Sequence, residues 1–210
     1  MTSNTWELIH AERRRLIEDL EPLTAEQWRT ASLCPKWNAQ QALGHIVATT
    51  KMTPPKFFGK IIASGFQFEK MAAKDVATES SGTPAQTLAE LAAHAEDTHA
   101  PPGPVVSWLG EIIVHGADIR RPLGVAYSPQ PATTRLVADF YKNSNLLIGS
   151  KNRIAGVRLV ATDVDWSNGT GPEASGPILS LVQAMTGRAV ALGDLSGDGV
   201  PTLKAKMPTG

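Results

Sequence analysis

Cysteine is nearly absent from this sequence of 210 residues, in which Cys34 is the single one. One cysteine cannot form an intramolecular disulfide, which excludes a small disulfide-stapled scaffold and suits a reducing compartment. Charged side chains run through the first twenty residues, so we expect no signal peptide there. No apolar run approaches the roughly 18 residues that a membrane helix needs. We therefore expect a cytoplasmic protein.

An excess of charge of either sign is also missing. The 20 lysines and arginines are balanced by 20 aspartates and glutamates, which gives a formal net charge of zero. Such a balance provides no chain-wide attraction to nucleic acid or to an anionic membrane, and we expect neither as a partner. The apolar fraction of 42% and the charged fraction of 19% fit an ordinary globular protein. We expect a monomer or weak homodimer.

The pattern of predicted elements changes near residue 150. Before this point, apolar residues at helical spacing, with proline and capping signals between them, predict four main helices and a further helix at about 131–148. After it, "IAGVRLVAT" and "PTLKAKM" are predicted as strands, with "GPILSLVQAMTGR" as a helix between them. We therefore expect a mainly α protein, with a four-helix bundle over residues 1–150 and a small α/β domain over residues 151–210.

Two polar residues interrupt an apolar helical stretch, "SWLGEIIVHGADIRRPLG", at residues 107–124. Glu111 and His115 are four positions apart in this stretch. Because a helix turns by about 100° per residue, the two side chains differ in direction by about 40° and project from one face. This spacing is used when one helix gives two ligands to a metal. Many Glu–His pairs at the same spacing bind nothing, so the spacing alone leaves both possibilities open.

A catalytic zinc needs a third protein ligand and an open coordination position. His45, in the apolar stretch "LGHIV", is the natural candidate, because a buried histidine without a partner is costly. The hypothesis is a divalent metal, most simply zinc, held by His45, Glu111 and His115. The alternative is a hydrogen-bond network in the core that satisfies the same three side chains without a metal.

Three blocks of the sequence carry a resemblance to a known family. They are "SLCPKWNAQQALGHIV", "GEIIVHGADIRRPLG" and "VRLVATDVDWSNGTGPEASGPILSLVQAMTGRAVALGDLSGDG". In this order they are similar to the mycothiol-dependent maleylpyruvate isomerase family within the DinB-like superfamily, over nearly the whole chain. The resemblance implies a DinB-like four-helix bundle that binds a divalent metal, usually zinc, and a small C-terminal domain. The family's ligands correspond to His45, Glu111 and His115.

The resemblance also implies an enzyme that uses the low-molecular-weight thiol mycothiol. A metal with two imidazole ligands and one carboxylate ligand keeps positive charge, which favours a bound thiolate over a thiol. In the isomerase, thiol addition to the cis double bond of maleylpyruvate allows rotation, and elimination gives fumarylpyruvate. In relatives the thiol is instead transferred to an electrophile. The sequence does not select between isomerase and S-transferase. The alternative is a non-catalytic binder of a small apolar ligand, because the C-terminal domain resembles a sterol-carrier-like fold.

Arg188 closes the predicted C-terminal helix at "MTGR". The family resemblance implies a functional arginine in this domain. A guanidinium can bind a carboxylate of the substrate or of mycothiol through two hydrogen bonds. We therefore assign Arg188 to catalysis and cofactor binding, against the alternative that it only caps the helix C-terminus.

Two further residues lie close to this chemistry in the sequence pattern. Asp118 could accept a hydrogen bond from His115 or form a salt bridge with Arg120 or Arg121. Cys34 has no histidine near it in the sequence. The resemblance places it in a structural C-x-x-W element, so we do not expect it to be a nucleophile.

Overall fold

The structure is a computed structural model that describes residues 2–146 and 148–208. It is mainly helical and contains one small sheet, which confirms the expected fold class. The chain forms two compact units, Met1–Tyr127 and Ser128–Gly210. Over the described residues, every helix is too short or too polar to cross a membrane.

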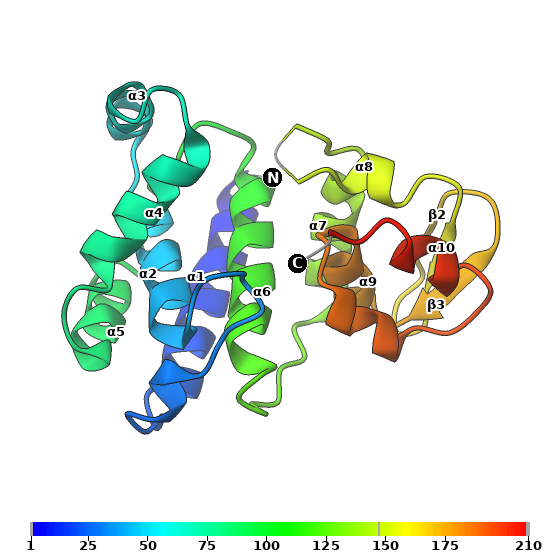
Figure 1. Cartoon of the computed structure of the whole chain (residues 1–210), viewed down its shortest axis with the longest axis horizontal. Helices are drawn as coiled ribbons and strands as arrows, with labels where there is room; N and C mark the ends of the chain where they lie inside the picture. Colours follow the sequence, from blue (N-terminus) through cyan, green and yellow to red (C-terminus); the bar gives the residue numbers. More distant parts are fainter. Residues whose placement is uncertain (1, 147, 209–210) are drawn as a thin grey trace. The chain divides into compact units, whose positions relative to one another are not determined.

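The first unit is a helical bundle (Figure 1). Within it, α2 packs against α4, α5 and α6, while α1 packs against α5 and α6. The bundle core includes large apolar side chains from four of these helices, each at most 1% exposed: Ile9, Leu16, Leu43, Leu91 and Ile113. The elements of this unit are α1 (Thr2–Leu20), the 3-10 helix η1 (Gln27–Arg29), α2 (Ala39–Thr50), α3 (Pro54–Ala63), α4 (Phe68–Glu79), α5 (Pro84–Ala93) and α6 (Val105–Arg120).

Capping fixes where α2 begins, and α2 carries one of the candidate ligands. The side chain of Asn38 accepts a hydrogen bond from the backbone N–H of Gln41, and the Gln41 side chain accepts one from the backbone N–H of Asn38. This reciprocal pair satisfies two backbone donors that the helix itself leaves free. Asparagine is among the residues most often found at helix N-caps. His45 consequently lies in the second turn of α2.

A buried charge links α1 to α6. The side chain of Arg120 is 1% exposed, and its Nε donates to Asp19 Oδ2 at 2.6 Å. The guanidinium also lies over the ring of Tyr127, 4.0 Å from the ring centroid. Gly116 makes room for it, since a Cβ there would lie 2.7 Å from Arg120 Nη1. Arg120, one of the two partners considered for Asp118, thus pairs with Asp19.

The second unit combines a sheet with helices (Figure 1). Its three-stranded sheet has the order β2-β1-β3, with β1 antiparallel to β2 and parallel to β3. Leu159 of β1 lies opposite Asn168 on one side and Ala174 on the other. The apolar helix α9 packs against both β1 and α7. The elements are α7 (Pro131–Tyr141), α8 (Ser150–Arg153), β1 (Arg158–Ala161), β2 (Ser167–Asn168), β3 (Glu173–Gly176), α9 (Ile178–Met185), the 3-10 helix η2 (Ala189–Asp194) and α10 (Val200–Lys204).

Two features of this unit differ from the sequence pattern. The segment "PTLKAKM" was expected to be a strand, but Val200–Lys204 forms α10. Pro201 lies in the first turn of this helix, where the missing N–H leaves no hydrogen bond unmade. The unit also begins at Ser128, ahead of the boundary expected after residue 150, because α7 packs against α9 rather than ending the bundle.

Candidate metal centre

The neighbouring helices α2 and α6 bring together the three side chains that the sequence selects. His45 Nε2 lies 2.7 Å from Glu111 Oε1, and His115 Nε2 lies 3.6 Å from Glu111 Oε2. The two imidazole rings meet nearly edge to face, with centroids 4.9 Å apart. One donor atom from each residue lies within 4.8 Å of the other two. The one-turn spacing within α6 and the packing of α2 on α6 therefore produce a convergent set of two nitrogens and one carboxylate.

This donor set fits a divalent metal. Ligand atoms at about 2.0–2.2 Å from a tetrahedral zinc lie roughly 3.4 Å from one another. The donor atoms of the three side chains lie within 4.8 Å of one another, with the shortest separation 2.7 Å, so only small side-chain movements are needed to bind the metal. The side chains of His45, Glu111 and His115 are 15%, 21% and 17% exposed. The site is therefore partly open, which leaves room for a further ligand beside three protein donors, as in catalytic zinc sites.

A second cluster lies behind His115. Cys34 Sγ donates to Asp118 Oδ2 at 3.1 Å, and His115 Nδ1 lies 3.1 Å from both of these atoms. These three residues could also hold a cation by donor type and distance. Asp118 is fully buried and Cys34 is 4% exposed, so this cluster offers no accessible position for a substrate. His115 belongs to both clusters, with Nε2 on the open side and Nδ1 on the buried side.

Sequence reasoning did not find the contact between Cys34 and His115. The two residues are separated by 81 positions, and no histidine close to Cys34 in sequence signals the contact. The backbone explains it, because the N–H of Leu33 donates to the carbonyl of Asp118 at 3.0 Å and ties this segment to α6. Asp118 is in contact with His115, one of the two roles considered for it.

The electrostatics of the cluster favour positive charge. Burial lowers the pKa of His115, but the carboxylate of Glu111, together with Cys34 and the hydrogen bond from His115 to Asp118, raises that pKa well above its ordinary value of 6.5. The carboxylates of Glu111 and Asp118 on either side of the His115 ring make positive charge favourable at this position. The donor set therefore suits a metal ion electrostatically as well as geometrically.

A small pocket of the first unit adjoins Glu111. Arg13, Thr49 and Trp108 are among the residues that line it. Thr49 Oγ1 donates to Glu111 Oε1 at 3.4 Å. Arg13 is 4% exposed and donates from Nη1 to the carbonyl of Asp97 at 2.7 Å, and burial lowers its pKa to about 10. The pocket thus presents a hydroxyl, a cation and an aromatic ring next to a candidate ligand.

Arg188 lies in the second unit, at the N-terminal end of η2. Its Nη1 donates to the carbonyl of Thr186 at 2.9 Å. A second guanidinium, that of Arg153, lies near it; burial and then the charge of Arg188 lower the pKa of Arg153. Arg153 packs on the turn at Gly187, where a Cβ would lie 3.4 Å from Arg153 Cζ. Both guanidinium groups donate hydrogen bonds to backbone carbonyls at this turn.

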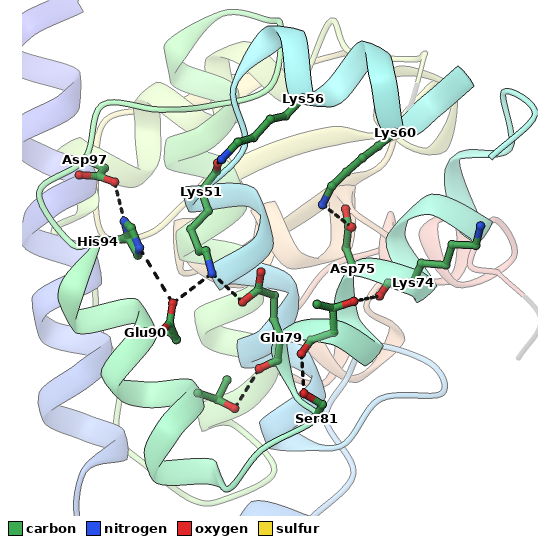
Figure 2. Close-up of polar contacts among 12 residues, drawn as sticks. Lys51, Lys56, Lys60, Lys74, Asp75, Glu79, Ser81, Glu90, His94 and Asp97 are labelled. Atoms are coloured by element: carbon green, nitrogen blue, oxygen red, sulfur yellow. Dashed lines mark hydrogen bonds and ion pairs between the residues drawn. The ribbon is translucent and has the colours of Figure 1, made fainter. Parts of the chain in front are cut away.

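Another polar cluster of the first unit is structural. Lys51, the C-cap residue of α2, donates to Glu79 of α4 and to Glu90 of α5, both at 3.0 Å, and His94 contacts Asp97 at 2.7 Å (Figure 2). Hydrogen bonding to Lys51 lowers the pKa of Glu90, and hydrogen bonding to His94 lowers the pKa of Asp97. Charges of opposite sign are paired throughout, so the cluster holds three helices together instead of creating a ligand set.

Comparison with known proteins finds one similar family and two similar solved structures. Residues 9–103 match the family described as "Mycothiol maleylpyruvate isomerase N-terminal domain", a segment that includes His45 and ends before α6. Two solved structures are similar: the crystal structure of the mycothiol-dependent maleylpyruvate isomerase and that of a histidine-to-alanine mutant of it. Both are 11% identical, with 94% of this chain and 93% of that chain covered and TM-scores of 0.65 and 0.64. At this identity the likeness shows the fold. No curated protein matches the sequence.

Proposed function

Because residues 9–103 match the family described as "Mycothiol maleylpyruvate isomerase N-terminal domain", we propose that this chain is a metal-dependent enzyme that activates mycothiol. Its reaction is isomerisation of a small electrophile such as maleylpyruvate, or transfer of the thiol to one. The observation that carries the proposal is the convergence of His45, Glu111 and His115 within 4.8 Å in a partly open site. The proposed cellular location is the cytoplasm.

The residues of the site have separate tasks in this proposal. A bound divalent metal, most simply zinc, supplies the positive charge that keeps a thiol ionised at neutral pH. Glu111 and the two histidines hold that charge in place. In isomerisation, the thiolate sulfur forms a bond to one carbon of the cis double bond. Rotation about the resulting single bond and cleavage of the same carbon–sulfur bond then give the trans product and return the thiolate.

We expect one divalent metal per chain, liganded by His45, Glu111 and His115. Elemental analysis of the protein, purified without chelator and then dialysed against zinc, measures the stoichiometry. The same preparation is then tested for conversion of maleylpyruvate and for thiol transfer to other electrophiles, with and without mycothiol. Turnover that needs no thiol would contradict the proposal. A zinc content far below one per chain after dialysis would contradict the metal site.

We expect Arg188→Lys to weaken turnover clearly and to change thermal stability little. Both mycothiol-type thiols and keto-acid substrates are polar, and the planar guanidinium fork orients a carboxylate better than the point charge of lysine. The neighbouring Arg153 adds positive charge at the same turn. Steady-state kinetics and thermal melts of the two proteins check this. Parallel losses of activity and stability would instead indicate that Arg188 caps the helix.

The alternative function, non-catalytic binding of a small apolar ligand by the second unit, is not favoured. The family match and the similar solved structures both refer to mycothiol-dependent isomerases. A binder of this kind also gives no reason for two histidines and a glutamate to converge in the first unit. Metal content separates the two functions, because the enzyme must retain a metal and the binder need not.

A further inference from the structure

One short segment touches both histidines of the candidate metal centre. We call Cys34–Trp37 the 34–37 turn; it lies between η1 and α2. At its start, Cys34 Sγ lies 3.1 Å from Nδ1 of His115. At its end, the ring of Trp37 lies over His45, with ring centroids 4.9 Å apart and planes tilted by 35°. Two residues that are three positions apart thus reach two ligands on different helices.

The backbone of the 34–37 turn is held firmly. The N–H of Trp37 donates to the carbonyl of Cys34 at 3.2 Å, which closes the turn. Lys36 has a φ of 73°, in the left-handed region that a residue with a Cβ rarely adopts. The N–H of Leu33 donates to the carbonyl of Asp118, so the segment is fixed to α6. Strain of this kind persists where the surrounding contacts determine the conformation.

The buried side of His115 determines its protonation pattern when it acts as a ligand. Asp118 Oδ2 accepts a hydrogen bond from Cys34 Sγ and lies 3.1 Å from His115 Nδ1. A carboxylate can only accept, so Nδ1 carries the hydrogen and donates it. Nε2 is then left with its lone pair directed toward Glu111, as a metal ligand requires. Cys34 gives the buried carboxylate a second donor, which offsets part of its desolvation cost.

We propose that the 34–37 turn, acting with Asp118, positions both histidine ligands. Cys34 and Asp118 fix the tautomer and ring plane of His115, and Trp37 fixes the ring plane of His45, so that both Nε2 atoms face Glu111. Cys34 is therefore a positioning residue that acts through Asp118 and His115, and its burial keeps it from reacting with substrate. This inference rests on the metal site of the proposed function.

The test is metal affinity in the full-length chain, measured by Co²⁺ titration and by competition with Zn²⁺. We expect Asp118→Asn to weaken binding about 10–100-fold, the range found when an outer partner of a ligating histidine is lost. Cys34→Ala is expected to weaken binding by about tenfold, at the lower end of that range. Cys34→Ser, which keeps a short donor, is expected to restore most of the affinity. Trp37→Leu removes the ring over His45, whereas Trp37→Phe keeps one.

Two further readouts separate positioning from a general structural role. The visible absorption of bound Co²⁺ reports ligand geometry and is expected to change in Asp118→Asn and Trp37→Leu but to stay unchanged in Lys36→Gly. Glycine accepts the left-handed backbone at this position, so this variant preserves the turn. Thermal melts of the metal-free proteins show whether each variant folds, and affinities are compared only among variants that do.

The outcomes distinguish this inference from the proposed function. If the parent chain binds Co²⁺ and the folded Cys34 and Asp118 variants bind it equally well with unchanged spectra, the positioning role is wrong and the metal site stands. If the parent chain takes up neither metal, the metal site itself fails and the positioning role falls with it. Weakened binding that Cys34→Ser restores supports the proposal.

Discussion

Replacing His115 with alanine is expected to remove the metal and the thiol-dependent activity together, while the helices stay folded. Complete ligand sets in structural zinc sites supply roughly 10–16 kcal/mol, so one ligand accounts for about 3–4 kcal/mol, or a roughly hundred- to thousandfold loss of affinity. The helix does not depend on this side chain, because α6 buries Ile112, Ile113 and Val114 against the bundle. Catalytic metals of helical bundles bind to a preformed core.

Circular dichroism, elemental analysis and thiol-dependent turnover measure the three parts of this expectation. His94→Ala is the matched control, because His94 belongs to the cluster with Glu90 and Asp97 (Figure 2) and is not one of the three ligands. We expect this control to retain both metal and activity. Loss of helical signal in His115→Ala would show that the site is structural. Retained metal in that variant would show that His115 is not a ligand.

Most of the helical bundle is predictable from local sequence signals. The capping residue Asn38 and the helical spacing of apolar residues predict α2, and the proline at 122 predicts that α6 ends near Arg121. The short C-terminal elements are less predictable. Periodicity does not separate a strand from a helix in a segment as short as Val200–Lys204, where Pro201 suits a helix start as well as an edge strand.

The candidate site also contains residues that the sequence predicts and a contact that it does not predict. Glu111 and His115 are recognisable from their spacing within one helix, and Asp118 lies one turn beyond His115. The contact of Cys34 with His115 depends on how the segment before α2 returns to α6, which no local pattern encodes. Tertiary backbone contacts of this kind determine which distant side chains meet.

Loss of the Asp19 side chain is expected to destabilise the first unit. Asp19→Ala removes the carboxylate that lies 2.6 Å from Arg120 Nε. The Arg120 side chain, which is only 1% exposed, then loses this ion-pair partner. Breaking a buried ion pair from one side typically costs about 3–5 kcal/mol. Asp19 is itself 25% exposed, so we expect a loss of about 3 kcal/mol in the free energy of unfolding, at the lower end of that range.

Chemical denaturation of the metal-free proteins measures this loss. Glu18→Ala is the matched control, because Glu18 is exposed on the same helix and its removal is expected to change stability by no more than about 0.5 kcal/mol. The double variant Asp19→Ala with Arg120→Met removes both charges and keeps an apolar side chain beside Tyr127. Because the cost comes from the unpaired buried charge, the double variant is expected to be more stable than Asp19→Ala alone. Equal stability of these two variants would show that Arg120 is hydrated once Asp19 is gone, and that the pair contributes little to holding α1 against α6.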